Sequence, residues 1–127
     1  MKLLLPFHLN KVGAGFPSQA TDCVEDEIDL NTHLIKNIPS TFLIRVQGKS
    51  MNKVGIHNGD LLVVDRSLNP KNFSTVIANV NEELVVKTFI KEKNQSFLAS
   101  GTSKINLKEN PEIFIWGVVT YVIHALL

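Results

Sequence analysis

The sequence predicts a mainly β protein: a compact, twisted, partly closed β-barrel-like domain with an extended N-terminal arm. From Thr41 onward, short runs rich in β-branched residues alternate with turn residues, which is typical of strands. No long stretch has clear helical periodicity. The 127 residues, 44% of them hydrophobic, fit one domain with its own hydrophobic core.

Residues 1–35 are expected to form the arm, and residues 36–127 the β-rich domain. Gly15 and Pro17 exclude a helix around them. The acidic run from Asp22 to Asp29 is expected to be solvated.

The strands of the domain are expected in short segments bounded by turn residues. They cover residues 41–46, 61–65, 75–80, 84–91, 96–99 and 114–124. Residues 81–83 and 93–95 can turn the chain between neighbouring strands, as in hairpins.

The charge balance argues against binding to nucleic acid, and the apolar segments argue against a membrane location. Thirteen basic and twelve acidic residues leave a net charge of +1, and the lysines are scattered, so direct sequence-specific DNA binding is not expected. The apolar start breaks at Pro6, too early for a secretory signal. The apolar stretch 113–127 is shorter than the roughly 20 residues that cross a bilayer. The protein is therefore expected to be cytoplasmic, with no membrane contact.

The single cysteine, Cys23, cannot form an internal disulfide. Its acidic neighbours disfavour a reactive thiolate, so we interpret it as an incidental residue of the arm. His8, His33 and His124 lack metal-ligand spacing, and with one cysteine a zinc site is not expected. The sequence predicts neither a metal nor another cofactor.

The residues with catalytic potential are Ser50, in Gly48-Lys49-Ser50-Met51, and Lys87, inside an apolar strand pattern. A serine hydroxyl attacks only after a base removes its proton, and a lysine is that base only as a neutral amine. An ordinary lysine, with a pKa of about 10.4, is neutral in about one molecule in a thousand near pH 7.4. Apolar neighbours on both faces of the strand favour the neutral form.

Each of these residues also has a purely structural interpretation. Ser50 can be an ordinary turn serine, and Lys87 an edge-strand lysine whose ammonium reaches solvent. His57 and Asp60 offer a serine-histidine-acid triad instead, but their glycine-flanked turn is expected to face water. Asp60 and Asp65 are interpreted as residues that hold the turn and the strand end.

Several short stretches along nearly the whole chain carry a family resemblance. They are Ala14-Gly15-Phe16-Pro17-Ser18, Ile28-Asp29-Leu30-Asn31, Gly48-Lys49-Ser50-Met51, Gly55-Ile56, Gly59-Asp60-Leu61-Leu62-Val63-Val64-Asp65, Val85-Val86-Lys87 and Gly117-Val118-Val119. Ser-Met followed by Gly-Ile and Gly-Asp-Leu is fairly specific, whereas an isolated Ala-Gly is not. In these stretches and in their order, the chain resembles the LexA/UmuD family of serine-lysine self-cleaving proteins.

Within that family, the resemblance is to the UmuD-like branch, because only 14 residues precede Gly15, too few for the helix-turn-helix of LexA-type repressors. Ala14 departs from that branch, which has cysteine there, and matches LexA.

This resemblance implies that Ser50 is the nucleophile and Lys87 the general base. The backbone N–H groups of Lys49 and Ser50 would form the oxyanion hole, and the cleaved bond would be Ala14–Gly15. The small side chain of Ala14 suits a shallow pocket, and Val12 can anchor the segment in an apolar groove.

The resemblance also implies a role in the DNA-damage (SOS) response. A filament of RecA on single-stranded DNA would stimulate self-cleavage. The shortened chain would then act as a homodimer, as accessory subunit of a UmuC-type DNA polymerase in translesion synthesis. Three alternatives remain open: a non-enzymatic dimeric interaction module on the same fold, a fragment of a LexA-type repressor, and a trans-acting peptidase of the signal-peptidase type.

Overall fold

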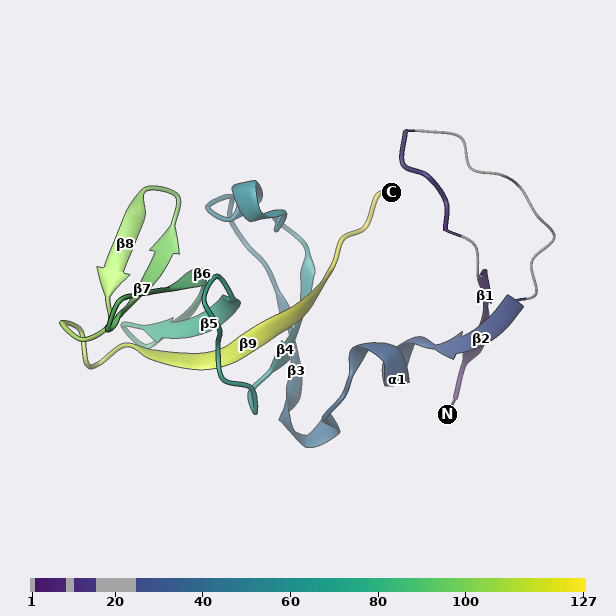
Figure 1. Ribbon diagram of the computed structural model, residues 1–127, viewed down its shortest axis with the longest axis horizontal. Coiled ribbons are helices and arrows are strands. Elements are labelled where there is room, and N and C mark those ends of the chain that lie inside the picture. Colours follow the sequence, from purple (N-terminus) through teal and green to yellow (C-terminus); the bar gives the residue numbers. More distant parts are fainter. Residues whose placement is uncertain (1, 9–10, 16–24) are drawn as a thin grey trace. The chain divides into compact units, whose positions relative to one another are not determined.

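The computed structural model describes residues 2–8, 11–15 and 25–127. The chain divides into two compact units, Met1–Lys36 and Asn37–Leu127, which are treated separately (Figure 1). Cys23 and the Phe16-Pro17-Ser18 part of the family motif lie outside the described residues.

The first unit contains a two-stranded antiparallel sheet of β1 (Leu4–His8) and β2 (Glu25–Asp29), followed by α1 (Leu30–Leu34). Asp29 caps α1, because its carboxylate accepts hydrogen bonds from the N–H of Asn31 at 3.2 Å and from the hydroxyl of Thr32 at 2.9 Å. The acidic run from Asp22 to Asp29 was expected only to be solvated, so β2 was not predicted. A strand can pair through its backbone while acidic side chains such as Asp26 and Glu27 stay exposed.

The second unit is an antiparallel sheet of seven strands in the order β3-β4-β9-β5-β6-β7-β8 (Figure 1). The sheet is not closed, and the mainly β, partly barrel-like fold class is confirmed. Its elements are η1 (Ile38–Ser40), β3 (Thr41–Arg45), η2 (Asn52–Val54), β4 (Leu61–Asp65), β5 (Thr75–Val80), β6 (Glu83–Glu92), β7 (Gln95–Ser100), β8 (Ser103–Asn106) and β9 (Phe114–Ile123).

The six strands expected from the sequence are all present, two of them with identical bounds, whereas β8 was not predicted. The hairpin between β5 and β6 turns at Asn81 and Glu82, whose φ angles of 52° and 66° lie in the left-handed region. Two such residues in succession are characteristic of the tight turn that matches the twist of paired strands.

The two faces of β5 pack into different apolar clusters, because neighbouring side chains of a strand point in opposite directions. Ile77 packs into a cluster with Val46, Met51, Ile56, Leu62 and Val64. Val76 and Ala78 pack into another with Phe89, Leu98 and Val118. Gly117 of β9 is needed for space, since a Cβ there would lie 2.6 Å from Cγ1 of Val64.

Trp116 of β9 lies between two side chains from other parts of the sheet. The guanidinium carbon of Arg66 lies 4.2 Å from the centre of the indole ring, and the Arg66 Nε donates a hydrogen bond of 2.9 Å to the Trp116 carbonyl. Phe42 of β3 meets the ring edge-on, with ring centres 5.3 Å apart. These contacts tie β3, the end of β4 and β9 together.

Within the described ranges, the structure contains no helix long and apolar enough to cross a lipid bilayer.

Candidate active site

Ser50 and Lys87, which are 37 positions apart in the sequence, line the same groove of about 380 Å³. The groove runs between the loop after β3 and the strands β5 and β6. Apolar and polar side chains both line it: its lining residues are Ile44, Arg45, Val46, Gln47, Gly48, Ser50, Met51, Ile77, Leu84, Val85, Val86 and Lys87.

The loop that carries Ser50 is closed at its base by two backbone hydrogen bonds. The Val46 N–H donates to the carbonyl of Asp60 at 2.8 Å, and the Gly59 N–H donates to the carbonyl of Val46 at 2.8 Å. At the start of the loop, Gly48 has a φ of 106°, and its N–H donates to Oδ1 of Asn58 at 2.9 Å. A residue with a Cβ rarely adopts this backbone conformation, so the sharp turn before Ser50 depends on glycine.

Ser50 itself is exposed, while the next residue, Met51, is only 4% exposed and anchors the loop in the core. Among the described residues, the backbone hydrogen bonds that fold the loop beyond Ser50 use the N–H groups of Asn52, Val54, Gly55 and Ile56, not those of Lys49 and Ser50. The loop therefore places Ser50 at the groove.

Lys87 lies on β6, opposite Val76 of β5, and is half-buried. Its Nζ donates a hydrogen bond of 2.7 Å to the hydroxyl of Ser100 on β7, rather than to Ser50. The register explains this contact: Thr88 pairs with Ala99, so Ser100 lies across from Lys87. In the part of the chain that the structure describes, Lys87 forms no ion pair with a carboxylate.

The sequence did not lead us to predict Ser100 as part of this site. It could have been found, because a tight turn at residues 93–95 fixes which residues of the two strands face each other. Counting back from the turn leads to Ser100 opposite Lys87.

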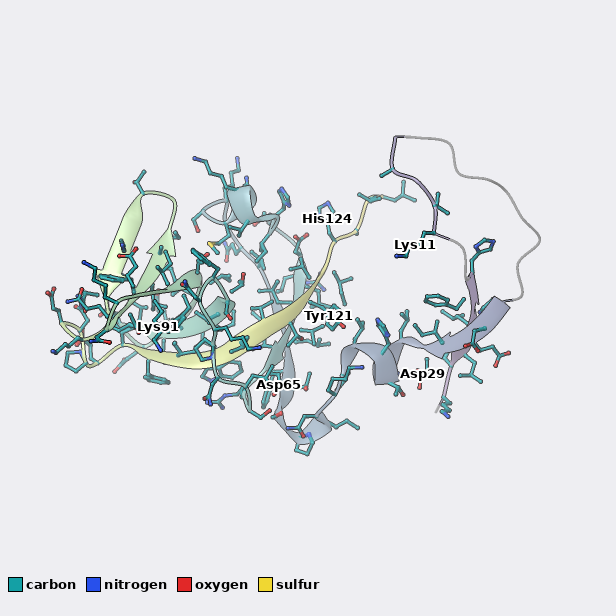
Figure 2. The ribbon with its side chains drawn as sticks, in the orientation of Figure 1. Lys11, Asp29, Asp65, Lys91, Tyr121 and His124 are labelled. Carbon is teal, nitrogen blue, oxygen red and sulfur yellow. The ribbon has the colours of Figure 1, made fainter. Side chains whose placement is uncertain are left out.

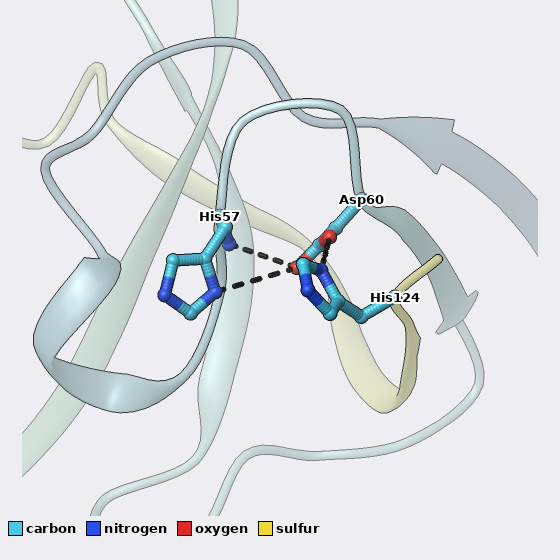
Figure 3. Close-up of side chains that lie close together, drawn as sticks. All are labelled: His57, Asp60 and His124. Atoms are coloured by element: carbon cyan, nitrogen blue, oxygen red, sulfur yellow. Dashed lines mark hydrogen bonds and ion pairs between the residues drawn. The ribbon is translucent and has the colours of Figure 1, made fainter. Parts of the chain in front are cut away.

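The alternative triad partners, His57 and Asp60, are not among the residues that line the groove with Ser50. Instead, Asp60 is buried and accepts the backbone N–H of His57 at 2.8 Å and contacts Nδ1 of His124 at 2.5 Å (Figure 3). The hydrogen bond with His124, followed by that from the His57 N–H, lowers the pKa of Asp60 below its usual value. Asp60 thus holds the turn, as its position suggested.

Asp65, at the other end of β4, holds the strand end in a similar way (Figure 2). Its Oδ1 accepts hydrogen bonds from the hydroxyls of Ser67 and Ser40, both at 2.7 Å, and from the Ser67 N–H at 2.8 Å. The bonds from Ser67 and Ser40 lower the pKa of the Asp65 carboxyl.

The segment expected to be cleaved belongs to the first unit and is described by itself. Val12 is 82% exposed, and Ala14 and Gly15 are also exposed. Gly15 has a φ of 88°, a backbone conformation that favours glycine. The segment is therefore accessible and bent at the expected bond.

The mainly β sheet and its serine- and lysine-lined groove agree with the sequence comparisons, which place the chain in a peptidase family. The Peptidase S24-like family model matches residues 6–120, so the chain belongs to this family. The resemblance to the LexA/UmuD family drawn from the motifs is confirmed.

Several curated proteins are similar over most of the chain. Protein ImpA of Salmonella typhimurium is 42% identical over 120 residues, which cover 94% of this chain and 83% of ImpA. Protein MucA of Escherichia coli is 35% identical over 121 residues, which cover 92% of this chain and 82% of MucA. The LexA repressor of Shewanella denitrificans is 38% identical over 98 residues, which cover 77% of this chain but only 47% of the repressor.

Proposed function

We propose that the chain is a self-cleaving serine peptidase in which Ser50 is the nucleophile and Lys87 the general base. The observation that carries this proposal is the shared groove, where the Ser50 hydroxyl and the half-buried Lys87 are lining residues and no carboxylate pairs with the lysine among the described residues. Membership of the Peptidase S24-like family supports it.

In the proposed reaction, the neutral amine of Lys87 takes the proton of the Ser50 hydroxyl, and the Ser50 oxygen attacks the carbonyl carbon of Ala14. The N–H groups of Lys49 and Ser50 donate to the oxyanion that forms. The protonated amine then gives its proton to the leaving nitrogen of Gly15, and the bond breaks. Water, activated by the same amine, hydrolyses the Ala14 ester and regenerates Ser50.

The substrate in this proposal is the arm, residues 1–35, and the peptidase domain is residues 36–127. The observed division of the chain after Lys36 supports such an arrangement. A tethered substrate has a high effective concentration, so weak docking of Val12 and Ala14 in the groove is sufficient for cleavage.

The biological role that we propose follows the family resemblance: cleavage in the cytoplasm during the SOS response, stimulated by a RecA filament on single-stranded DNA. The filament would act by favouring the docked conformation of the arm, without supplying a chemical group. The product, Gly15–Leu127, would form a homodimer and serve as accessory subunit of a UmuC-type translesion polymerase.

The test is intact-mass measurement of the purified chain during incubation at about pH 10, where a large fraction of lysine side chains is neutral. The wild-type chain should lose residues 1–14 and nothing else. Ser50→Ala and Lys87→Ala should remain intact while keeping the circular dichroism of the wild type. Lys91→Ala is the matched control, because Lys91 is an exposed lysine of the same strand, and it should be cleaved normally (Figure 2).

The rate should also rise with pH, by about tenfold per unit below the titration of the amine, because the neutral base becomes more populated. At neutral pH, activated RecA filament should accelerate the same cut. A chain that stays intact under both conditions would instead be a non-enzymatic interaction module. A rate that is flat from about pH 7 to 10 contradicts a lysine base.

A further inference from the structure

A second cluster of reactive side chains lies outside the groove, where β9 ends beside the turn before β4 (Figure 3). Leu61 pairs with Ile123, so the next residues outward, Asp60 and His124, come together although 64 positions separate them. His57 reaches the same carboxylate from within the turn, with its Nδ1 3.9 Å from Oδ2 of Asp60.

The donor atoms of the three side chains all lie within 4.8 Å of one another. Zinc binds imidazole nitrogen and carboxylate oxygen at about 2.0–2.2 Å, so neighbouring ligands of one tetrahedral ion are about 3.4 Å apart. His124 Nδ1 lies 2.5 Å from Oδ1 of Asp60, and His57 Nδ1 lies 3.9 Å from its Oδ2, so the two separations lie on either side of that value. Both imidazoles are nearly half exposed, 47% for His57 and 46% for His124, and can rotate into place.

The carboxylate of the cluster is already fixed in place. Asp60 is 2% exposed, and the His57 N–H donates to its Oδ2 at 2.8 Å, the kind of supporting hydrogen bond that orients a metal-binding carboxylate. A carboxylate and two imidazole nitrogens suit a divalent ion that prefers nitrogen ligands, and disfavour magnesium or calcium, which prefer oxygen throughout.

We propose that His57, Asp60 and His124 bind a divalent transition metal of the zinc class, with the remaining coordination position left to solvent. The bound ion would bridge the Ser50-bearing loop and the segment after β9. The spacing of histidines along the sequence did not predict this site, because its three ligands come close only in the folded sheet. The site shares no residue with the groove, so it does not depend on the proposed peptidase activity.

Isothermal titration of the full chain with Zn²⁺ tests the proposal, together with the visible absorption of Co²⁺, which reports imidazole coordination. We expect one ion per chain, and at least about tenfold weaker binding in His57→Gln and in His124→Gln. Zn²⁺ should also raise the melting temperature of the wild type, but not that of these variants. Replacing the buried Asp60 is avoided, since its loss can unfold the turn.

Two variants provide matched controls: His33→Gln, a histidine of α1 in the other unit, and Cys23→Ser, which removes the only thiol. Both should bind Zn²⁺ as the wild type does. The proposal is overturned if binding is unchanged in His57→Gln and His124→Gln, if it disappears in Cys23→Ser, or if the wild type binds no Zn²⁺ up to about 100 µM.

Discussion

The loop that carries Ser50 and the hairpin that carries Lys87 meet at one groove but are built in opposite ways. The loop is irregular, exposed at Ser50 but anchored by the buried Met51, and it is held by backbone hydrogen bonds and by the positive φ of Gly48. The hairpin is regular, and cross-strand pairing places Lys87 half-buried beside the Ser100 hydroxyl. In the proposed reaction, the loop would therefore set the position of the attacking hydroxyl, whereas the hairpin would set the surroundings of the amine.

The strongest way to separate these two contributions is Lys87→Arg. Arginine keeps the positive charge and can still donate to Ser100, but it does not deprotonate in a protein, so it cannot act as a base. Cleavage measured by intact mass should fall by about 10²–10⁴-fold at every pH from about 7 to 10. Lys91→Arg should cleave normally. Substantial activity in Lys87→Arg would mean that the hairpin supplies only charge.

A substitution in the loop, Gly48→Val, should lower the cleavage rate only by displacing Ser50. A Cβ at position 48 would meet no neighbouring atom within 4 Å, but Gly48→Val forces a branched residue to a φ of 106°. The turn before Ser50 should shift, and a misplacement of about 1 Å can reduce the cleavage rate by about 10²-fold. The pH dependence of the remaining activity should match the wild type, since the hairpin is untouched. A changed pH profile in Gly48→Val would contradict the separation of roles.

A smaller change on the hairpin side is Ser100→Ala. The Lys87 side chain then loses the acceptor of its 2.7 Å hydrogen bond, so the amine is less well positioned. We expect the maximal cleavage rate to fall by roughly tenfold. Ser100→Thr, which keeps the hydroxyl, should restore the rate. An unchanged rate in Ser100→Ala would show that Ser100 does not position Lys87.

The smallest expected effect concerns stability away from the groove, at Asp65. Its pKa is lowered in the folded state by Ser67 and Ser40, so its contribution to stability is present above the ordinary value of about 4 and is lost on acidification below that. Urea midpoints measured from about pH 6 to 3 should therefore fall more steeply for the wild type than for Asp65→Asn. The exposed Glu112→Gln should follow the wild type. Parallel curves for Asp65→Asn and wild type would contradict this role.

Much of the sheet could be predicted from the sequence, because turn residues bound its strands clearly. β4 and β5 begin and end at the predicted residues. β2 escaped prediction because five residues with four acidic side chains have no apolar alternation, and β8 because its four residues are too short for a period. Pairing with a neighbouring strand, which propensity does not measure, stabilises both.

The site was predictable only in part, for a related reason. Lys87 stands out because a lysine inside an apolar strand pattern is unusual, and Ser50 because it lies in a motif that resembles the family. Ser100 and the pair formed by Asp60 and His124 are ordinary in sequence. They become partners through the register of the hairpin and of β4 with β9. Register over 64 positions depends on the whole sheet, so local patterns do not reveal it.

The aromatic and guanidinium contacts of Trp116 have a practical consequence. Because the chain has only one tryptophan, its tryptophan fluorescence originates from a single point, where β3, the end of β4 and β9 are held together. Emission should therefore red-shift when the central strands separate. Tryptophan emission can then distinguish a variant that has unfolded from one that keeps its fold but no longer cleaves itself.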